Sequence, residues 1–523
     1  MSGHVFVARS DITRLCCNAW LLPTDASLGV TRAWVDAAVK IGISAFPTQT
    51  DRGRWEKRKS RTLAIKPWHA SKGAAPAPIP ILTDTGAWAG KDFKWYLEGV
   101  SEFVAEALQS IRHPKARSTD RATAWRSKDL LAVPLVGSGA GGKSAHKGTM
   151  ETLLLERLRD EANKNDVDIA LIVRGEAAYA AAQSARRRVG FEEAGLSAKD
   201  IELLDDLANS ARAGSLVLFI GAGLSKAAGL PLWRELLDQL AKSAELNAAE
   251  IEALKTLPSL DAASILEKRF LAKSRDLRQE AIEATTASCF GIGHALIAEL
   301  PVFERVTTNY DNLIEQSLDA IGRLPAVLPY EPSSSPHGWL LKLHGSTSHA
   351  TCDIVLTRQD YLRYNGTRGA LYGIVQALLL TRHIFFIGFS LEDDNFYGLV
   401  DEVRQAVEGP NMTHAVKTPF GTAFVPSGKV LRKELWDKEV RIEEFGDLPE
   451  YSRKLEIALD YVACMASSNL SHLLDESFDD ILNDDEKQLK RGVLALQSQI
   501  GNARGSIFAS TRAFLLKFGL MLD

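Results

Sequence analysis

A turn of small residues directly after an apolar run is the first feature of this sequence that could do chemistry. The run Ser215–Ile220 reads as a buried strand of a parallel sheet. The chain then continues with four small residues that open a helix, Gly221, Ala222, Gly223 and Ser225. Glycines at this place let the backbone approach a phosphate, and the helix N-terminus stabilises the phosphate charge. A structural tight turn is the alternative for the glycines alone, because Lys226 stands where G-x-G-x-x-G would have its third glycine.

Later segments of the chain add polar side chains to this turn. In chain order they are TTNYDNLIE (307–315), LKLHGS (341–346), LTRQDY (356–361) and GFSLEDD (388–394). The first, second and fourth segments each follow a predicted strand, and these strands are Arg305–Thr307, Trp339–Leu343 and Ile384–Gly388. Ligands of open α/β sheets bind at the carboxyl ends of the strands. We therefore expect these segments to meet the glycine turn in one site.

Together the segments resemble the sirtuin superfamily. They resemble more closely the sirtuin-like NAD-hydrolase domains of bacterial anti-phage defence proteins, in which GAG-x-S, TTNYD, KLHG and GFS-x-x-D recur in this order. The resemblance covers about 197–445 and implies a Rossmann-like parallel sheet that binds NAD. It implies that the NAD diphosphate is held by Gly221, Ala222, Gly223 and Ser225, and that the adenosine half is lined by Gly388, Ser390 and Asp393. It also places Asn309 and Asp311 beside the nicotinamide ribose and makes His344 the catalytic histidine.

The residue types suit cleavage of the nicotinamide–ribose bond. The leaving group is a cationic pyridinium that departs as a neutral base, so the paired carboxylates of glycosidases are unnecessary. The site needs instead to exclude bulk water, to orient one water or hydroxyl, and to offer a base that titrates near neutral pH. His344 can be that base, Asn309 can orient the water, and Asp311 can bind the carboxamide. A turn residue followed by a helix N-cap also explains an Asn-x-Asp pattern, and the companion segments favour the functional interpretation.

The expected activity is an NAD glycohydrolase that releases nicotinamide and ADP-ribose and depletes NAD in abortive-infection defence against phage. An NAD-dependent protein deacylase or ADP-ribosyltransferase is the enzymatic alternative. Deacylating sirtuins carry a four-cysteine zinc module, which this chain lacks, and Gly229–Arg234 departs from their Gly-Ile-Pro-Asp-Phe-Arg turn. NAD is therefore expected as the substrate, with water as acceptor and no metal. A nucleotide-sensing assembly module without turnover is the non-enzymatic alternative, and a dehydrogenase is disfavoured because Trp233–Leu246 reads as a helix.

The N-terminal block, Met1 to Gly190, also alternates strand-like runs with helical stretches. Two of its segments resemble macro domains, which bind ADP-ribose: Asp11–Thr13 and the strand with its glycine loop, Ala132–Gly142. Where macro domains have Asn-Ala-Ala-Asn and a glycine run, this chain has Leu22–Gly29. Binding of an ADP-ribose-type nucleotide coupled to NAD cleavage, and a scaffold that mediates assembly, are both open for this block.

Length and composition predict several α/β domains, because 523 residues exceed what one core supports. We expect a macro-like domain at 1–190, a sirtuin-like domain at 197–445 with a helical insertion at 244–300, and an α-helical tail at 448–523. The change at 190–197 is followed by Ser197 and Asp200, which predict a capping box.

The partners and the location follow from charge, cysteines and the resemblance. The 62 basic and 66 acidic residues give a net charge of −4, so nucleic acid is not an expected partner, and basic stretches such as Arg52–Arg61 and Arg112–Lys128 read as solvated loops. Five scattered cysteines and a start without a signal pattern suit the cytoplasm, and the most apolar stretch, Leu371–Leu391, is interrupted, so no membrane span is expected. The resemblance implies a homo-oligomer and a HerA-like translocase ATPase as partner.

Overall fold

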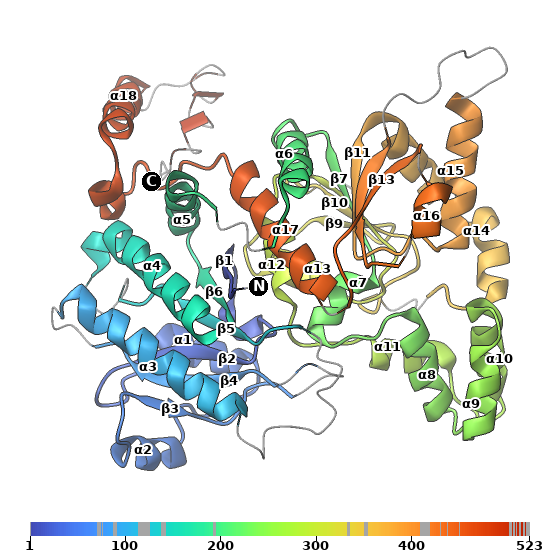
Figure 1. The fold of residues 1–523 in the computed structure, drawn as a ribbon, viewed down its shortest axis with the longest axis horizontal. Helices are drawn as coiled ribbons and strands as arrows, with labels where there is room; N and C mark the ends of the chain where they lie inside the picture. The colour runs from blue at the N-terminus through green and yellow to red at the C-terminus, as the bar shows by residue number, and fades with distance from the viewer. Residues whose placement is uncertain are drawn as a thin grey trace.

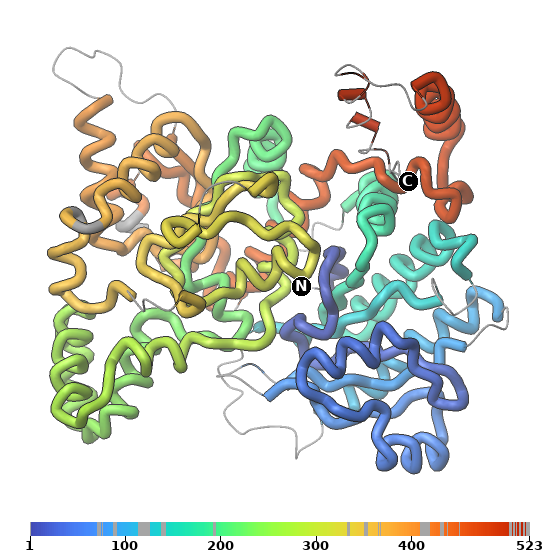
Figure 2. The backbone as a smooth tube through the Cα atoms, turned by 180° about the vertical axis from the view of Figure 1, so that it is seen from behind, coloured from blue at the N-terminus to red at the C-terminus, as the bar shows by residue number. Residues whose placement is uncertain are grey.

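The computed structural model describes most of the chain: 2–70, 75, 77–86, 91–112, 126–137, 143–191, 195–331, 335–349, 354–407, 419–428, 430–436, 438–448, 450–500 and isolated positions beyond 500. Two β-sheets organise these residues, one on each side of the molecule in Figure 1. Figure 2 shows the same two sides from behind, with the N-terminal part in blue to cyan. Within the described residues, none of the helices combines the length and the apolar character needed to cross a bilayer.

The N-terminal sheet has the strand order β1-β6-β5-β2-β4-β3. Its described strands are β1 (Val5–Arg9), β2 (Ala19–Thr24), β3 (Thr62–Ala64), β4 (Ile79–Asp84), β5 (Leu130–Pro134) and β6 (Asp168–Val173). The strands pair in parallel except β3, which runs antiparallel to β4. The predicted runs near Val5, Leu130 and Val167 are thus confirmed as strands, and the predicted α/β class of this block is confirmed.

The second sheet has the order β13-β12-β11-β7-β8-β10-β9 and its pairs are parallel. Its described strands are β7 (Leu216–Ile220), β8 (Glu304–Thr307), β9 (Ala326–Leu328), β10 (Trp339–Lys342), β11 (His383–Ile387), β12 (Gly421–Val425) and β13 (Val440–Glu444). Apolar runs correctly predicted β7, β8, β10 and β11. The short edge strand β9 and the pair β12 and β13 were not predicted.

Helices cover the outer faces of both sheets. On the N-terminal sheet, α3 (Phe93–Arg112) and α4 (Lys147–Asn165) pack over Val5, Val7 and their neighbours in one apolar cluster. On the second sheet, α14 (Arg358–Thr381) and α15 (Asp394–Val407) pack over Val217 and Phe219 in another. The remaining helices of the N-terminal part are α1 (Arg32–Lys40), α2 (Gln49–Glu56) and α5 (Glu176–Val189).

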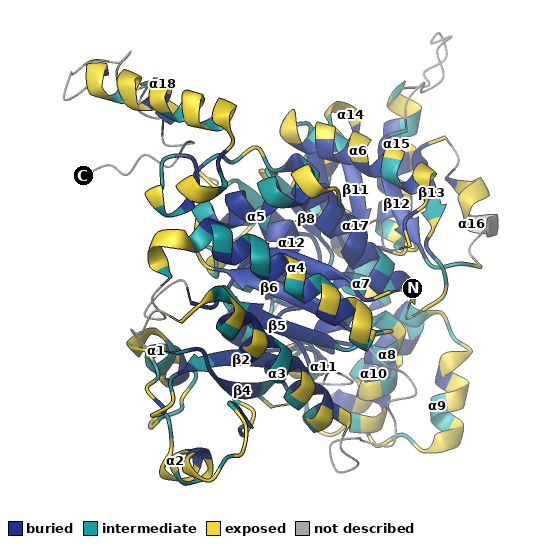
Figure 3. Ribbon diagram, turned by 60° about the vertical axis from the view of Figure 1, so that its left-hand side comes forward, coloured by how far each residue is buried: buried dark blue, intermediate teal, exposed yellow. Residues whose placement is uncertain are grey.

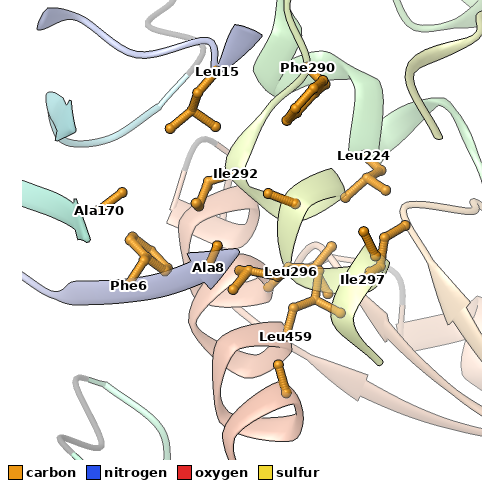
Figure 4. Close-up of a cluster of buried hydrophobic side chains, with 14 of the residues drawn as sticks. Phe6, Ala8, Leu15, Ala170, Leu224, Phe290, Ile292, Leu296, Ile297 and Leu459 are labelled. Carbon is orange, nitrogen blue, oxygen red and sulfur yellow. The ribbon is translucent and has the colours of Figure 1, made fainter. Parts of the chain in front are cut away.

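The inner faces of the two sheets share one hydrophobic core. This core contains Phe6 and Ala170 from the N-terminal sheet together with Leu218 and Phe385 from the second sheet. Two helices fill the space between them, α12 (Ile292–Glu299) and α17 (Glu450–Ala466), beside α6 (Ala198–Arg212) and α13 (Leu313–Asp319). Figure 4 shows side chains of α12 and α17 meeting those of β1 in this core.

Sequence explains why α12 and α17 can occupy this position. Residues Ile292–Ala298 of α12 are all buried, and a helix that is apolar around its whole circumference is stable only when it is covered on all sides. Most residues of α17 are buried as well, and its buried charged residues Arg453, Glu456 and Asp460 form ion pairs with the N-terminal part. The predicted capping box at the start of α6 is present, with Ser197 and Asp200 exchanging hydrogen bonds.

Four other helices form a separate layer at the lower right of Figure 1 and share their own apolar cluster. They are α8 (Trp233–Ser243), α9 (Ala248–Lys255), α10 (Ser259–Leu271) and α11 (Leu277–Ala284). The helical pattern predicted for 244–300 therefore divides between this layer and α12. The described C-terminal part adds α16 (Val430–Leu435) and α18 (Asp484–Ile500), and α18 projects from the surface with many exposed residues (Figure 3).

Candidate active site

Four parallel strands bring the predicted segments to one edge of the second sheet. In register, Ile220 of β7 pairs with Thr307 of β8 and with Ile387 of β11, and Thr307 pairs with Lys342 of β10. Gly221, Asn309, His344 and Gly388 follow these paired residues within two positions. The carboxyl ends of β7, β8, β10 and β11 therefore deliver the glycine turn, the TTNYD segment, the KLHG segment and the GFS segment to the same place.

Glycines are required at this edge because two backbone turns pack closely against each other. The amide of Gly223 donates to the carbonyl oxygen of Gly388 at 2.9 Å, which joins the turn after β7 to the turn after β11. A Cβ on Gly223 would lie 2.7 Å from that oxygen, and one on Gly388 would lie 2.4 Å from the amide nitrogen of Leu224. Gly388 also has φ +61°, which disfavours other residues. The turn continues through α7 (Ala222–Ser225), where Ala222 is half-buried.

A buried hydrogen-bonded cluster follows the turn. Asn309 donates from Nδ2 to Ser225 Oγ at 3.1 Å, and Ser225 Oγ donates to Asp311 Oδ2 at 2.9 Å. Ser225, Asn309 and Asp311 are each no more than 5% exposed. The amide oxygen of Asn309 is buried and has no hydrogen-bond partner. Because buried polar atoms are ordinarily paired, this oxygen is the atom of the cluster that is open to a ligand or an ordered water.

Asp311 combines the two roles considered for it. Its Oδ1 accepts from the amide of Leu313 at 3.1 Å at the start of α13, as a helix-capping residue does, while its Oδ2 accepts from Ser225. Burial raises the pKa of Asp311, and Lys342 counteracts that rise. Lys342 is completely buried and donates to Glu315 at 2.7 Å and to the carbonyl oxygen of Asp311. Asn309 itself does not have the positive φ of a left-handed turn residue.

His294 belongs to this cluster and was not singled out from the sequence. It lies on α12, is fully buried, and places Nε2 3.5 Å from Ser225 Oγ. Burial lowers the pKa of His294 to about 3, although a backbone hydrogen bond to Gly291 opposes the shift, so the imidazole is neutral. An apolar helix ordinarily carries a histidine for packing, so the sequence signal was only the Gly-Ile-Gly-His start of α12 before TTNYD.

His344 lies in a second group, formed by the loop after β10 and the starts of α14 and α15. It is 4% exposed, and its Nε2 lies 3.7 Å from Asp393 Oδ2. Tyr361 donates its hydroxyl to the same Asp393 oxygen at 2.9 Å, and its ring meets the imidazole edge-on. Burial lowers the pKa of His344, Asp393 raises it, and Arg368 lowers it. Ser390 of the same GFS segment is exposed.

Two observations bear on the other expected sites. In the described part of the chain, no three histidine, cysteine, aspartate or glutamate side chains are grouped as metal ligands. In the N-terminal part, Asp11 follows β1 and its Oδ1 accepts from the amide and the hydroxyl of Thr13 at 3.1 and 2.7 Å. The glycine loop is described only as far as Gly137, so 138–142 lie outside the described residues, as do 113–125 of the second basic stretch.

Comparison with known proteins finds a family model that matches part of this site. Residues 304–444 match the family model of the SIR2-like domain. The match contains the TTNYD, KLHG and GFS segments, and the predicted sirtuin-like region is thereby confirmed for these residues. Among characterised relatives, the NAD(+) hydrolase ThsA of Enterococcus faecium is 27% identical over 46% of this chain and 48% of its own length. The defense-associated sirtuin 2 of Bacillus subtilis is 27% identical over 39% of this chain and 21% of its own.

This chain spans less than half of the length of either relative. Among solved structures, the macrodomain of Oceanobacillus iheyensis with ADP aligns with 36% of this chain and 92% of its own length. The sequences are 15% identical there, and the TM-score is 0.26.

Proposed function

We propose that this protein is an NAD glycohydrolase that cleaves the nicotinamide–ribose bond and gives nicotinamide and ADP-ribose. The observation that carries the proposal is the buried, unpartnered amide oxygen of Asn309, which lies two residues beyond β8 at the edge where β10 delivers His344. The SIR2-like match and the relatives named NAD(+) hydrolase support the same activity.

In this proposal, Asn309 orients the attacking water and His344 accepts a proton from it. The Nδ2 group of Asn309 is held by Ser225, so its Oδ1 is fixed in orientation and can accept a hydrogen bond from the water. His344 is the base, because its lowered pKa keeps the imidazole neutral at physiological pH. Both side chains are at least nine-tenths buried, which strengthens electrostatic stabilisation of the positive charge that develops on the ribose.

The glycine turn, Ser225 and Asp311 would position the dinucleotide. Asp311 is fixed through both carboxylate oxygens and adds negative potential close to Asn309. Gly221, Ala222 and Gly223 supply the backbone that approaches the diphosphate, and the turn of Gly388, Ser390 and Asp393 forms the adjacent wall.

The cellular role follows from the same relatives. A sirtuin that defends against phage by emptying the cell of NAD would act in the cytoplasm, and we propose this setting together with a homo-oligomeric assembly and a HerA-like ATPase partner. For the N-terminal sheet we propose an ADP-ribose-type nucleotide ligand. The position of Asp11–Thr13 at the carboxyl end of a parallel strand supports it, because ligands of such sheets bind there.

The test is purified protein incubated with NAD, with the products resolved by chromatography in the presence and absence of candidate nucleotide activators. We expect Asn309→Ala and His344→Ala each to lower nicotinamide release at least about a thousandfold while the thermal unfolding midpoint is retained. The matched controls are Asn209→Ala and His337→Ala, which change an exposed asparagine and an exposed histidine. Nicotinamide release retained by either site variant would contradict the catalytic assignment, and transfer of NAD label to protein would favour the transferase.

A further inference from the structure

A carboxylate, that of Asp393, lies beside His344, and the mechanism proposed above gives it no role in catalysis. Asp393 Oδ2 lies 3.7 Å from His344 Nε2, a distance too long for a strong hydrogen bond but short for two groups shielded from water. Within the described residues, the other charged or titratable groups seen to face His344 come from α14, and they are Arg368, Tyr361 and Tyr364. Burial raises the pKa of both tyrosines, so they are neutral and Arg368 is the opposing charge.

Two helices fix the Asp393 carboxylate with respect to the imidazole. Its Oδ1 accepts from the amide of Phe396 at 3.1 Å, which caps the start of α15. Its Oδ2 accepts from the hydroxyl of Tyr361, one residue after Asp360 of the capping box that begins α14. One oxygen therefore serves the helix and the other faces His344, so the carboxylate cannot turn away without losing both hydrogen bonds.

The backbone around His344 is fixed as well. The hydroxyl of Tyr364 donates to the carbonyl oxygen of Leu343 at 2.7 Å, and Arg368 donates to the same oxygen at 2.9 Å. The amide of Val355 donates to the carbonyl oxygen of His344 at 3.0 Å. With Nε2 turned toward Asp393, Nδ1 is the ring nitrogen left for the reacting water.

We propose that Asp393 is a positioning residue for His344, which holds the orientation of the imidazole and stabilises the imidazolium that forms when His344 accepts a proton. This inference rests on the proposed NAD hydrolysis. In that step a water O–H bond breaks toward His344 as the water oxygen bonds to the ribose C1′ carbon. Nicotinamide leaves with the electron pair of the bond between C1′ and its ring nitrogen. The proton remains on His344 and is released to solvent afterwards.

Tyr361 has the opposite effect on the same pair. Its hydroxyl donates to the oxygen that faces His344 and so withdraws part of the negative charge from the imidazole. Removal of Asp393's charge and removal of the Tyr361 hydroxyl should therefore move the basicity of His344 in opposite directions. A residue with only a structural role would not produce such a pair of shifts, and neither would a residue that only contacts the adenosine half of NAD.

The first experiment compares Asp393→Asn and Tyr361→Phe in pH profiles of kcat and KM for NAD. Asparagine keeps an oxygen that can cap α15 and removes the charge. We expect Asp393→Asn to lower kcat about tenfold to a hundredfold, to leave KM within about twofold, and to move the acid limb of kcat to lower pH. Tyr361→Phe should move that limb to higher pH. Asp394→Asn, which changes the exposed neighbouring carboxylate, is the matched control and should leave the profile unchanged.

The second experiment needs no NAD. The histidine Cε1–Hε1 signals of the full-length protein are titrated by NMR, and the signal of His344 is assigned by its loss in His344→Gln. We expect the pKa of His344 to fall in Asp393→Asn and to rise in Tyr361→Phe. A wild-type protein without NAD cleavage but with these NMR shifts would overturn the proposed function and leave the positioning of His344 intact. Active protein in which Asp393→Asn raises only KM, with both pH profiles unchanged, would overturn the inference and assign Asp393 to NAD binding.

Discussion

Two buried polar regions of this molecule differ in how completely their charges are paired. Where α17 meets the N-terminal sheet, three arginines face three carboxylates: Arg126, Arg186 and Arg453, and Asp168, Glu456 and Asp460. At the edge of the second sheet, Asn309 Oδ1 is buried without a partner, and His344 faces a carboxylate at a distance longer than a hydrogen bond.

This difference distinguishes polar groups that stabilise the fold from polar groups that are available to bind a ligand. A buried charge that is paired with good geometry costs little once its partner is present, and loss of the partner is costly. An unpaired buried polar atom costs free energy in every folded molecule unless something binds to it. We infer that the network at α17 holds this helix against the N-terminal sheet, and that the open atom at the sheet edge is left for a ligand. Mutations should therefore lower stability in the first region and activity in the second.

The largest expected effect on stability is the loss of Asp168, which is completely buried and accepts from both Arg126 and Arg453. Asp168→Asn should lower the free energy of unfolding by about 3–5 kcal/mol, because two buried guanidinium groups lose their common counter-charge. Urea unfolding measures this change. Asp166→Asn is the control: its carboxylate pairs with Lys128 but is 70% exposed, so about 1 kcal/mol or less is expected. Equal effects in the two variants would contradict the structural role of the network.

Glu456 gives this region a pH dependence. Burial raises the pKa of Glu456 to about 7, although Arg126 opposes the rise. Between its usual pKa near 4.5 and about 7, the folded protein binds a proton at this carboxyl that the unfolded chain has released, so stability falls as pH rises through this window.

In Glu456→Gln, the decrease in the free energy of unfolding across this pH window should be smaller than in the wild type by up to about 3 kcal/mol, since one pKa unit corresponds to about 1.4 kcal/mol. The measurement is the free energy of unfolding at several pH values between about 4.5 and 7. The difference between variant and wild type isolates this carboxyl, because the other titratable groups are present in both proteins and Asp168 and Asp460, whose pKa values are lowered, titrate below this window. Parallel curves for the two proteins would exclude Glu456 as the source.

Much of the fold could be predicted from the sequence because its central strands are continuous apolar runs. Ser215–Ile220 and Ile384–Gly388 lie in the middle of the second sheet, where both faces are covered, and such strands have an unambiguous pattern. β9 has three residues at an edge, too few to carry a pattern. The position of α12 and α17 between the sheets was not predictable, because helical periodicity shows how much of a helix is buried and not which element covers it.

The candidate site shows the same limit at the level of residues. Convergence of the TTNYD, KLHG and GFS segments follows from parallel strands alone, since their carboxyl ends share an edge. The contact between His344 and Asp393 joins residues 49 positions apart. The contact between Ser225 and His294 joins the end of the glycine turn to an apolar helix. Neither contact can be recognised in a single sequence, because the residues that it joins are far apart along the chain. The resemblance placed Asp393 at the adenosine half, and its position beside His344 became visible only in the structure.

Replacement of Ser225 has the smallest expected effect on activity, and it tests directly whether the cluster at the sheet edge differs from the network at α17. It is 1% exposed, accepts from Asn309, donates to Asp311, and touches neither of the two atoms proposed to act on water. Ser225→Ala should lower the free energy of unfolding by about 1–3 kcal/mol, because two buried polar atoms lose a partner, and should lower kcat about tenfold, because Asn309 loses the contact that orients its amide. Ser225→Thr, which retains the hydroxyl, should recover part of the rate. If Ser225→Ala instead kept its rate, the cluster at the sheet edge would be structural like the network at α17, and the unpartnered oxygen of Asn309 would no longer mark a ligand site.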